Sequence, residues 1–65
     1  MIKIGAIYTV STDKKEFAPQ FYPCLGERVR VTGAKHLGKY PVDFLDKPEL
    51  IKVAQKVRED LLIKN

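Results

Sequence analysis

The chain of 65 residues contains one cysteine, one histidine and no tryptophan. The single cysteine, Cys24, excludes an internal disulfide and with it a disulfide-stapled scaffold. One cysteine and one histidine are also too few for a zinc site built from those residues within one chain. Packing of apolar side chains must therefore hold the fold together, with help from a partner where packing is not enough.

Long apolar runs are missing as well. The longest, Leu61–Ile63, has three residues, whereas a membrane span needs about 20. We therefore expect a soluble, cytoplasmic protein in a reducing compartment, without a membrane partner. The short chain predicts a single domain over residues 1–65.

Catalytic motifs are a third absence. The sequence contains no nucleophile elbow, phosphate-binding loop, dinucleotide fingerprint or zinc-protease motif. His36 is interpreted as a solvated loop residue, because catalysis would require an orienting carboxylate and a nucleophile in a cleft. Asp43 and Asp46 are interpreted as a strand charge and a helix cap rather than as a metal pair. We predict that the chain is not an enzyme, with no catalytic residues, metal site, cofactor or small-molecule substrate.

Alternating apolar residues predict three strands, over Ile2–Val10, Arg28–Thr32 and Lys39–Leu45. The second strand alternates most clearly, with Val29 and Val31 expected to face the core between polar neighbours. A proline within the third strand is typical of a strand at the edge of a sheet. The predicted strands are short, so the sheet needs a cover over its apolar face.

The stretch between the first two strands is irregular, because two prolines interrupt it. It carries three aromatic residues within six positions: Phe17, Phe21 and Tyr22. We interpret these aromatics as a plug for the core. A binding surface is the alternative.

A C-terminal helix is predicted to supply the cover. Asp46 and Glu49 have the spacing of a capping box, and Pro48 falls in the first turn. Apolar residues then recur at helical spacing, which predicts an amphipathic helix over about Lys47–Lys64. Arg58 falls within the apolar arc of this helix and is interpreted as a snorkelling side chain. A contact at the seam between helix and sheet is the alternative for Arg58.

Residues 25–42 resemble a KOW motif, a strand-loop-strand unit of SH3-like small barrels in ribosomal proteins and transcription elongation factors. The matching positions are Gly26, Val29–Val31, Lys35, Gly38–Lys39 and Val42. Residues 39–46 are similar to a strand of Tudor-type barrels, which share the SH3-like architecture. The resemblance implies a loop that contacts RNA or protein. We therefore predict an α+β fold, in which a small SH3-like antiparallel sheet or barrel packs against one C-terminal amphipathic helix.

Positive charge is concentrated in the middle of the sequence. The chain has 12 Lys and Arg against 8 Asp and Glu, a net charge of +4. Residues 24–40 hold four cations and one carboxylate, so most of the surplus lies there. The candidate contact residues are Arg28, Arg30, Lys35, His36 and Lys39. They predict a small basic binding module that contacts nucleic acid through a strand-loop patch.

Two other functions remain open at this point. The same patch suits an acidic protein surface, as in an adaptor or a small, phage-type regulator or inhibitor of a larger host protein. The chain could also be a structural subunit that dimerises through the edge of the predicted strand Lys39–Leu45. The sequence alone does not choose between nucleic acid and protein as the partner.

Overall fold

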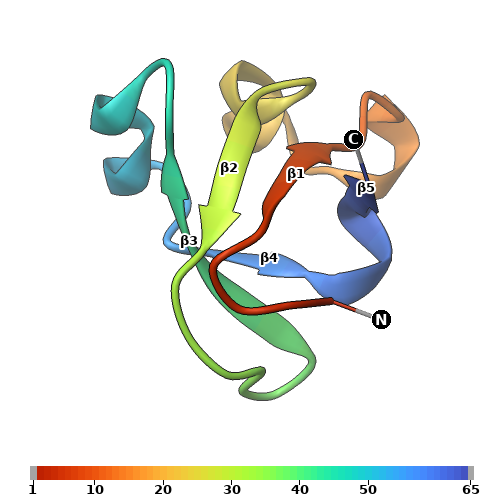
Figure 1. Ribbon diagram of the computed structural model, residues 1–65. Helices are drawn as coiled ribbons and strands as arrows, with labels where there is room; N and C mark the ends of the chain where they lie inside the picture. The colour runs from red at the N-terminus through yellow and green to blue at the C-terminus, as the bar shows by residue number, and fades with distance from the viewer. Residues whose placement is uncertain (1, 65) are drawn as a thin grey trace.

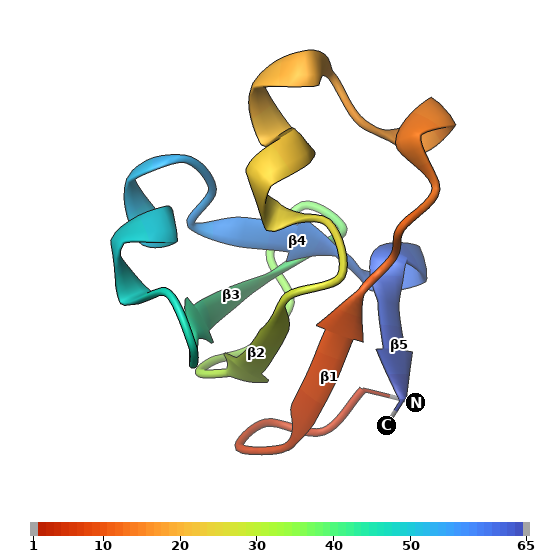
Figure 2. The same ribbon diagram turned by 90° about the horizontal axis from the view of Figure 1, so that it is seen from above.

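The computed structural model describes residues 2–64, which form a curved antiparallel sheet (Figure 1). Within this part of the chain, five strands follow the spatial order β4-β3-β2-β1-β5. The strands are β1 (Ile7–Val10), β2 (Arg28–Val31), β3 (Lys39–Phe44), β4 (Lys56–Arg58) and β5 (Leu62–Lys64). The view from above shows the sheet curling so that β4 and β5 approach each other (Figure 2). The strands β4 and β5 are the two ends of the sheet, and each has three residues.

The helical turns of the described residues are all 3₁₀ helices. They are η1 (Lys14–Glu16), η2 (Pro19–Cys24), η3 (Pro48–Lys52) and η4 (Glu59–Leu61). The predicted α+β class with a C-terminal amphipathic helix is therefore wrong. No helix of residues 2–64 is long and apolar enough to cross a membrane.

Residues 47–64 form η3, β4, η4 and β5 in place of the predicted helix. Leu50, Val57, Leu61 and Leu62 are buried along this path, just as they would be on the apolar face of a helix. The strands additionally pair with the outer edges of β3 and β1, whose backbone groups would otherwise lack partners. The sheet therefore satisfies the same apolar pattern and also pairs the edges of β3 and β1.

The predicted capping box is also absent. The Asp46 carboxylate accepts hydrogen bonds from the Arg28 side chain instead of capping a helix. Lys47 occupies the N-cap position of η3 and makes no side-chain cap bond. A sequence spacing that suits a cap is thus used for a contact between β2 and the turn after β3.

The second and third predicted strands are confirmed within one residue at their ends, and the first is shorter than predicted. The chain bends at Gly5, which has φ +89° and donates its N–H to the carbonyl of Val31 at 2.7 Å. This positive φ is one that glycine adopts without the steric cost of a side chain. The first strand consequently begins at Ile7 rather than Ile2.

The prediction that Lys39–Leu45 is an edge strand is wrong, because β3 lies between β2 and β4. Its second half, Val42–Phe44, pairs with β2, and its first half pairs with β4. Pro41 sits where these two ladders meet, and its carbonyl accepts the N–H of Thr32 at 2.9 Å. The missing proline N–H therefore falls at the end of the ladder with β2, where it costs least.

The core lies inside the curved sheet. Tyr8, Val29 and Phe44 are in register across β1, β2 and β3, and all three are buried. Val31 is buried too, so the inward positions predicted for β2 are confirmed. Cys24 is buried at the end of η2, as expected for a small apolar side chain.

Candidate functional site

The five residues of the predicted patch are exposed but do not form one surface of free cations. Arg28 and Arg30 project outward from β2, Lys35 and His36 lie in the loop between β2 and β3, and Lys39 begins β3. The backbones of His36 and Lys39 exchange hydrogen bonds of 2.7 and 3.1 Å. This pairing closes the loop and fixes its direction.

Two cations of the patch are held by carboxylates. The Arg28 guanidinium donates to both oxygens of Asp46, at 3.1 and 2.9 Å. These hydrogen bonds raise the pKa of Arg28 and lower the pKa of Asp46. The Lys35 Nζ donates to Glu59 at 3.1 Å, which raises the pKa of the lysine. The remaining cation of β2, Arg30, lies directly across from Asp43 in the sheet.

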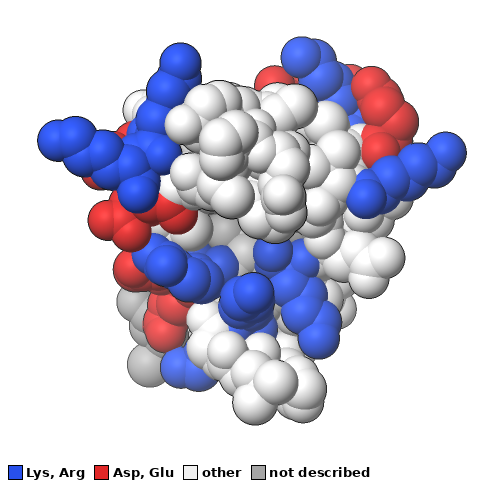
Figure 3. All heavy atoms as spheres, turned by 180° about the vertical axis from the view of Figure 1, so that it is seen from behind, with Lys and Arg blue, Asp and Glu red and all other residues white. Residues whose placement is uncertain are grey.

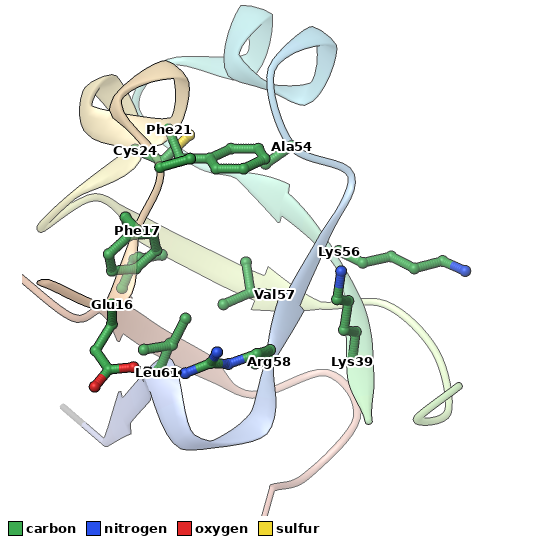
Figure 4. Close-up of a pocket in the computed structure, with 12 residues that line it drawn as sticks. Glu16, Phe17, Phe21, Cys24, Lys39, Ala54, Lys56, Val57, Arg58 and Leu61 are labelled. Carbon is green, nitrogen blue, oxygen red and sulfur yellow. Dashed lines mark hydrogen bonds and ion pairs between the residues drawn. The ribbon is translucent and has the colours of Figure 1, made fainter. Parts of the chain in front are cut away.

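A different surface combines an apolar hollow with free positive charge. A pocket of about 200 Å³ opens between the segment that contains η1 and η2 and the strand β4 (Figure 4). Its buried lining residues are Val10, Cys24, Val57 and Leu61. Phe17, Phe21 and Ala54 add further apolar lining. The pocket is thus an opening of the core itself toward solvent.

A second, shallower hollow of about 350 Å³ continues from this pocket. The two hollows share Phe21, Lys39, Ala54 and Lys56, and the second is further lined by Lys52, Val53 and Gln55. We call the two hollows together the β4 groove. The view from behind shows an uncharged lobe bordered by Lys and Arg side chains (Figure 3).

Charge in the β4 groove is predominantly positive. Four cations line it, against the single carboxylate of Glu16. Arg58 binds that carboxylate at 2.9 Å and Asp60 at 3.0 Å, and the hydrogen bonds raise the pKa of Arg58. The other three cations, Lys39, Lys52 and Lys56, have no carboxylate partner among residues 2–64. Figure 4 shows Lys39 and Lys56 side by side, with Arg58 pointing toward Glu16.

Arg58 makes its ion pairs from a strand, whereas both interpretations of this residue from the sequence assumed a helix. The residue lies on β4 and is half-buried. Its two ion pairs join β4 to η1 and to η4. The predicted snorkelling on a helix is wrong, because the segment is a strand.

The three aromatic residues of the irregular stretch have different environments. Phe17 packs against the core, while the half-buried Phe21 lines both hollows of the β4 groove. Tyr22 is 38% exposed, and the Lys14 Nζ lies 5.3 Å from its ring centroid, which is within cation–π range. Phe17 thus packs on the core as predicted, and the alternative of a binding surface stays a prediction.

Neither Cys24 nor His36 is placed for nucleophilic catalysis. Burial, and then the charge of Glu27, raise the pKa of the Cys24 thiol, which disfavours the reactive thiolate. His36 is exposed in its loop and does not line the β4 groove. Among residues 2–64 no three His, Cys, Asp or Glu side chains gather to hold a metal ion. The absence of enzymatic activity stays a prediction.

Comparison with protein-family models, with curated proteins and with solved structures found no match to this chain. The resemblance to KOW and Tudor-type barrels therefore stays a prediction.

Proposed function

We propose that this chain is a small non-enzymatic module that binds an acidic protein segment in the β4 groove. The observation that carries the proposal is the apolar pocket beside three lysines that lack carboxylate partners within residues 2–64. A regulator or adaptor of a larger protein is the role that fits such a module. A cytoplasmic location belongs to the same proposal, because a lone cysteine suits a reducing compartment.

The pocket supplies a site for an apolar anchor of the partner. A volume of about 200 Å³ is large enough for one apolar side chain. Burial of a side chain such as Leu or Phe contributes about 1.5–3 kcal/mol. An anchor in a desolvated pocket, surrounded by polar contacts, is the usual arrangement of energetic hot spots at interfaces.

The lysines supply charge complementarity around that anchor. Lys39, Lys52 and Lys56 are exposed, so their main effects are to accelerate encounter and to select acidic partners. Their attraction is screened by salt, over a distance of about 8 Å at physiological ionic strength. Binding should therefore weaken with salt but persist, because the apolar contact remains.

A single-stranded nucleic acid suits the pocket less well than a protein segment does. Three of its four buried lining residues, Val10, Val57 and Leu61, have purely hydrocarbon side chains. A base that entered the pocket would lose the hydrogen bonds between its polar edges and water without replacing them, at about 1–3 kcal/mol for each group. An apolar side chain carries no such penalty.

Selection from a random peptide library displayed against the immobilised chain tests the proposal. We expect enrichment of peptides that combine Asp or Glu with a large apolar residue. In titrations with one such synthetic peptide, the double variant K39E/K56E should lose about tenfold or more in affinity. The double variant K3E/K15E is the matched control, because it also reverses two charges, at exposed lysines that do not line the groove; its affinity should stay within about twofold.

A fluorescent single-stranded RNA and a DNA of mixed sequence provide the opposing measurement. The nucleic-acid function would replace the proposed one under two conditions. The RNA or the DNA would have to bind in a salt-dependent way that K39E/K56E abolishes, and the library would have to yield no acidic peptide. Equal effects of K39E/K56E and K3E/K15E on peptide affinity would also contradict the proposal.

A further inference from the structure

The strand β4 has a partner on one side only. It is the last strand in the order of the described sheet, and β3 is its neighbour. Its other edge faces the pocket, across from Phe17 and Phe21 (Figure 4). The β4 groove therefore runs along a strand edge without a backbone partner among residues 2–64, which the Arg58–Glu16 ion pair bridges at one end.

The hydrogen-bond register identifies which backbone groups point into the groove. The N–H of Val42 donates to the carbonyl of Gln55 at 3.2 Å, and the N–H of Glu59 donates to Gly38 at 3.3 Å. Hydrogen-bonded pairs alternate with non-bonded pairs along an antiparallel ladder. Val57 thus directs its N–H and C=O toward Tyr40 of β3, its partner in the register.

Lys56 and Arg58 occupy the alternate positions, so their N–H groups point away from β3. No backbone hydrogen bond between residues 2–64 outside the regular ladders and helices uses either N–H. These donors are spaced as an additional strand requires.

We propose that the acidic partner binds by adding an extended segment to the free edge of β4, as a further strand of the sheet. The proposal rests on the proposed function and specifies how the β4 groove recognises its partner. Main-chain hydrogen bonds with the amides of Lys56 and Arg58 hold the segment, in the manner of β-augmentation. The sequence of the partner determines whether the added strand runs parallel or antiparallel to β4.

Side chains along β4 determine what the added strand must carry. Val57 is buried and lines the pocket. Lys56 borders the groove, but it is exposed, and strand alternation directs its side chain to the opposite face from Val57. Neighbouring strands place side chains of the same face next to each other. The segment therefore alternates apolar residues, which enter the pocket, with acidic residues, which meet Lys56 and the adjacent Lys39.

Pairing of β4 with a second copy of this chain is disfavoured by the same residues. An antiparallel pair of two β4 edges centred on Val57 would set Lys56 of one copy opposite Arg58 of the other. Like charges directly opposite each other destabilise a strand pair, and lysine on an edge strand commonly prevents such self-association. The positive charges of β4 thus disfavour pairing between two copies of this edge and favour pairing with an acidic strand.

The test uses the full chain labelled with ¹⁵N and short synthetic peptides that alternate Glu with Val or Leu. Backbone N-methylation of every second peptide residue removes the donors of one side of the added strand, and methylation of the remaining residues removes those of the other. The peptides methylated on the side that faces β4 should lose about tenfold or more in affinity. The peptides methylated on the opposite side should stay within about twofold. Exchange of the Lys56 and Arg58 amide protons should slow at least tenfold on binding.

Each outcome bears on a different step. Strand addition is overturned if the two methylated peptide sets bind with equal affinity and the exchange of the Lys56 and Arg58 amides stays unchanged on binding. The proposed binding of an acidic segment would still stand in that case. Failure of both the peptides and the random library to bind overturns the function itself. Concentration-dependent protection of the same amides without peptide shows self-pairing and also overturns the proposal.

Discussion

Val29→Ala tests the core of the sheet most directly. Val29 is fully buried on β2, with Tyr8 and Phe44 as its neighbours on the two adjoining strands. The substitution removes two methyl groups, each worth about 0.8 kcal/mol in transfer free energy, and it leaves a cavity. We expect a loss of about 2–3 kcal/mol in the free energy of unfolding.

That loss is large for a chain of this length. Typical stabilities of about 0.05–0.15 kcal/mol per residue give about 3–10 kcal/mol for the whole domain. The midpoint of thermal unfolding should therefore fall by about 10–20 °C. Urea and thermal unfolding followed by far-ultraviolet circular dichroism measure both quantities.

Val53→Ala is the matched control, because it makes the same chemical change at a residue that is 37% exposed at the end of η3. Its cost should stay below about 0.5 kcal/mol. Equal costs at the two positions, or a Val29→Ala variant as stable as the parent chain, would refute the assignment of Val29 to a tightly packed core.

Three further predictions concern the backbone, the charges and the thiol. In the free chain the amide proton of Val57 should exchange slowly and that of Lys56 rapidly in hydrogen-exchange NMR, whereas a helix would protect both. The Arg28 guanidinium lowers the pKa of Asp46, so the pair contributes its full stability above the unfolded-state pKa of about 3.9 and loses it as pH falls through the lowered pKa. The difference in urea midpoint between the parent chain and Arg28→Gln should therefore vanish at low pH. Cys24 should react with iodoacetamide much more slowly in the folded chain than in urea; equal rates would contradict its burial.

Two central strands could be predicted from the sequence because their pattern allows one interpretation. Alternation in Arg28–Val31 has a period of two, and burial of Val29 and Val31 follows from it. The same holds for Val42 and Phe44 of β3. Such segments pair with neighbours on both sides, so local pattern and tertiary context agree.

The C-terminal segment could not be predicted in the same way. Leu50, Val57 and Leu61 have a spacing that suits one face of a helix, and the alternation of Lys56–Arg58 suits a short strand equally well. Choosing between them requires knowledge that β3 and β1 have unpaired edges, which is a property of the folded sheet. Propensity is a weak guide where tertiary pairing decides the outcome.

The location of free positive charge was missed for a related reason. Counting along the sequence places the surplus in residues 24–40 and finds residues 41–65 neutral. In the fold, carboxylates from the neutral segment bind cations of the basic one: Asp46 binds Arg28, and Glu59 binds Lys35. The basic segment thereby loses half of its free cations.

These ion pairs leave lysines in another part of the described surface without a carboxylate partner. Because Asp46 and Glu59 are engaged with β2 and its loop, and Asp60 with Arg58, Lys52 and Lys56 beside β4 have no carboxylate partner in the described part of the chain. They meet Lys39, the one residue that the predicted patch and the β4 groove have in common. The charge available to a partner is therefore set by which carboxylates the fold has already used, and in this fold it borders an apolar pocket and an open strand edge.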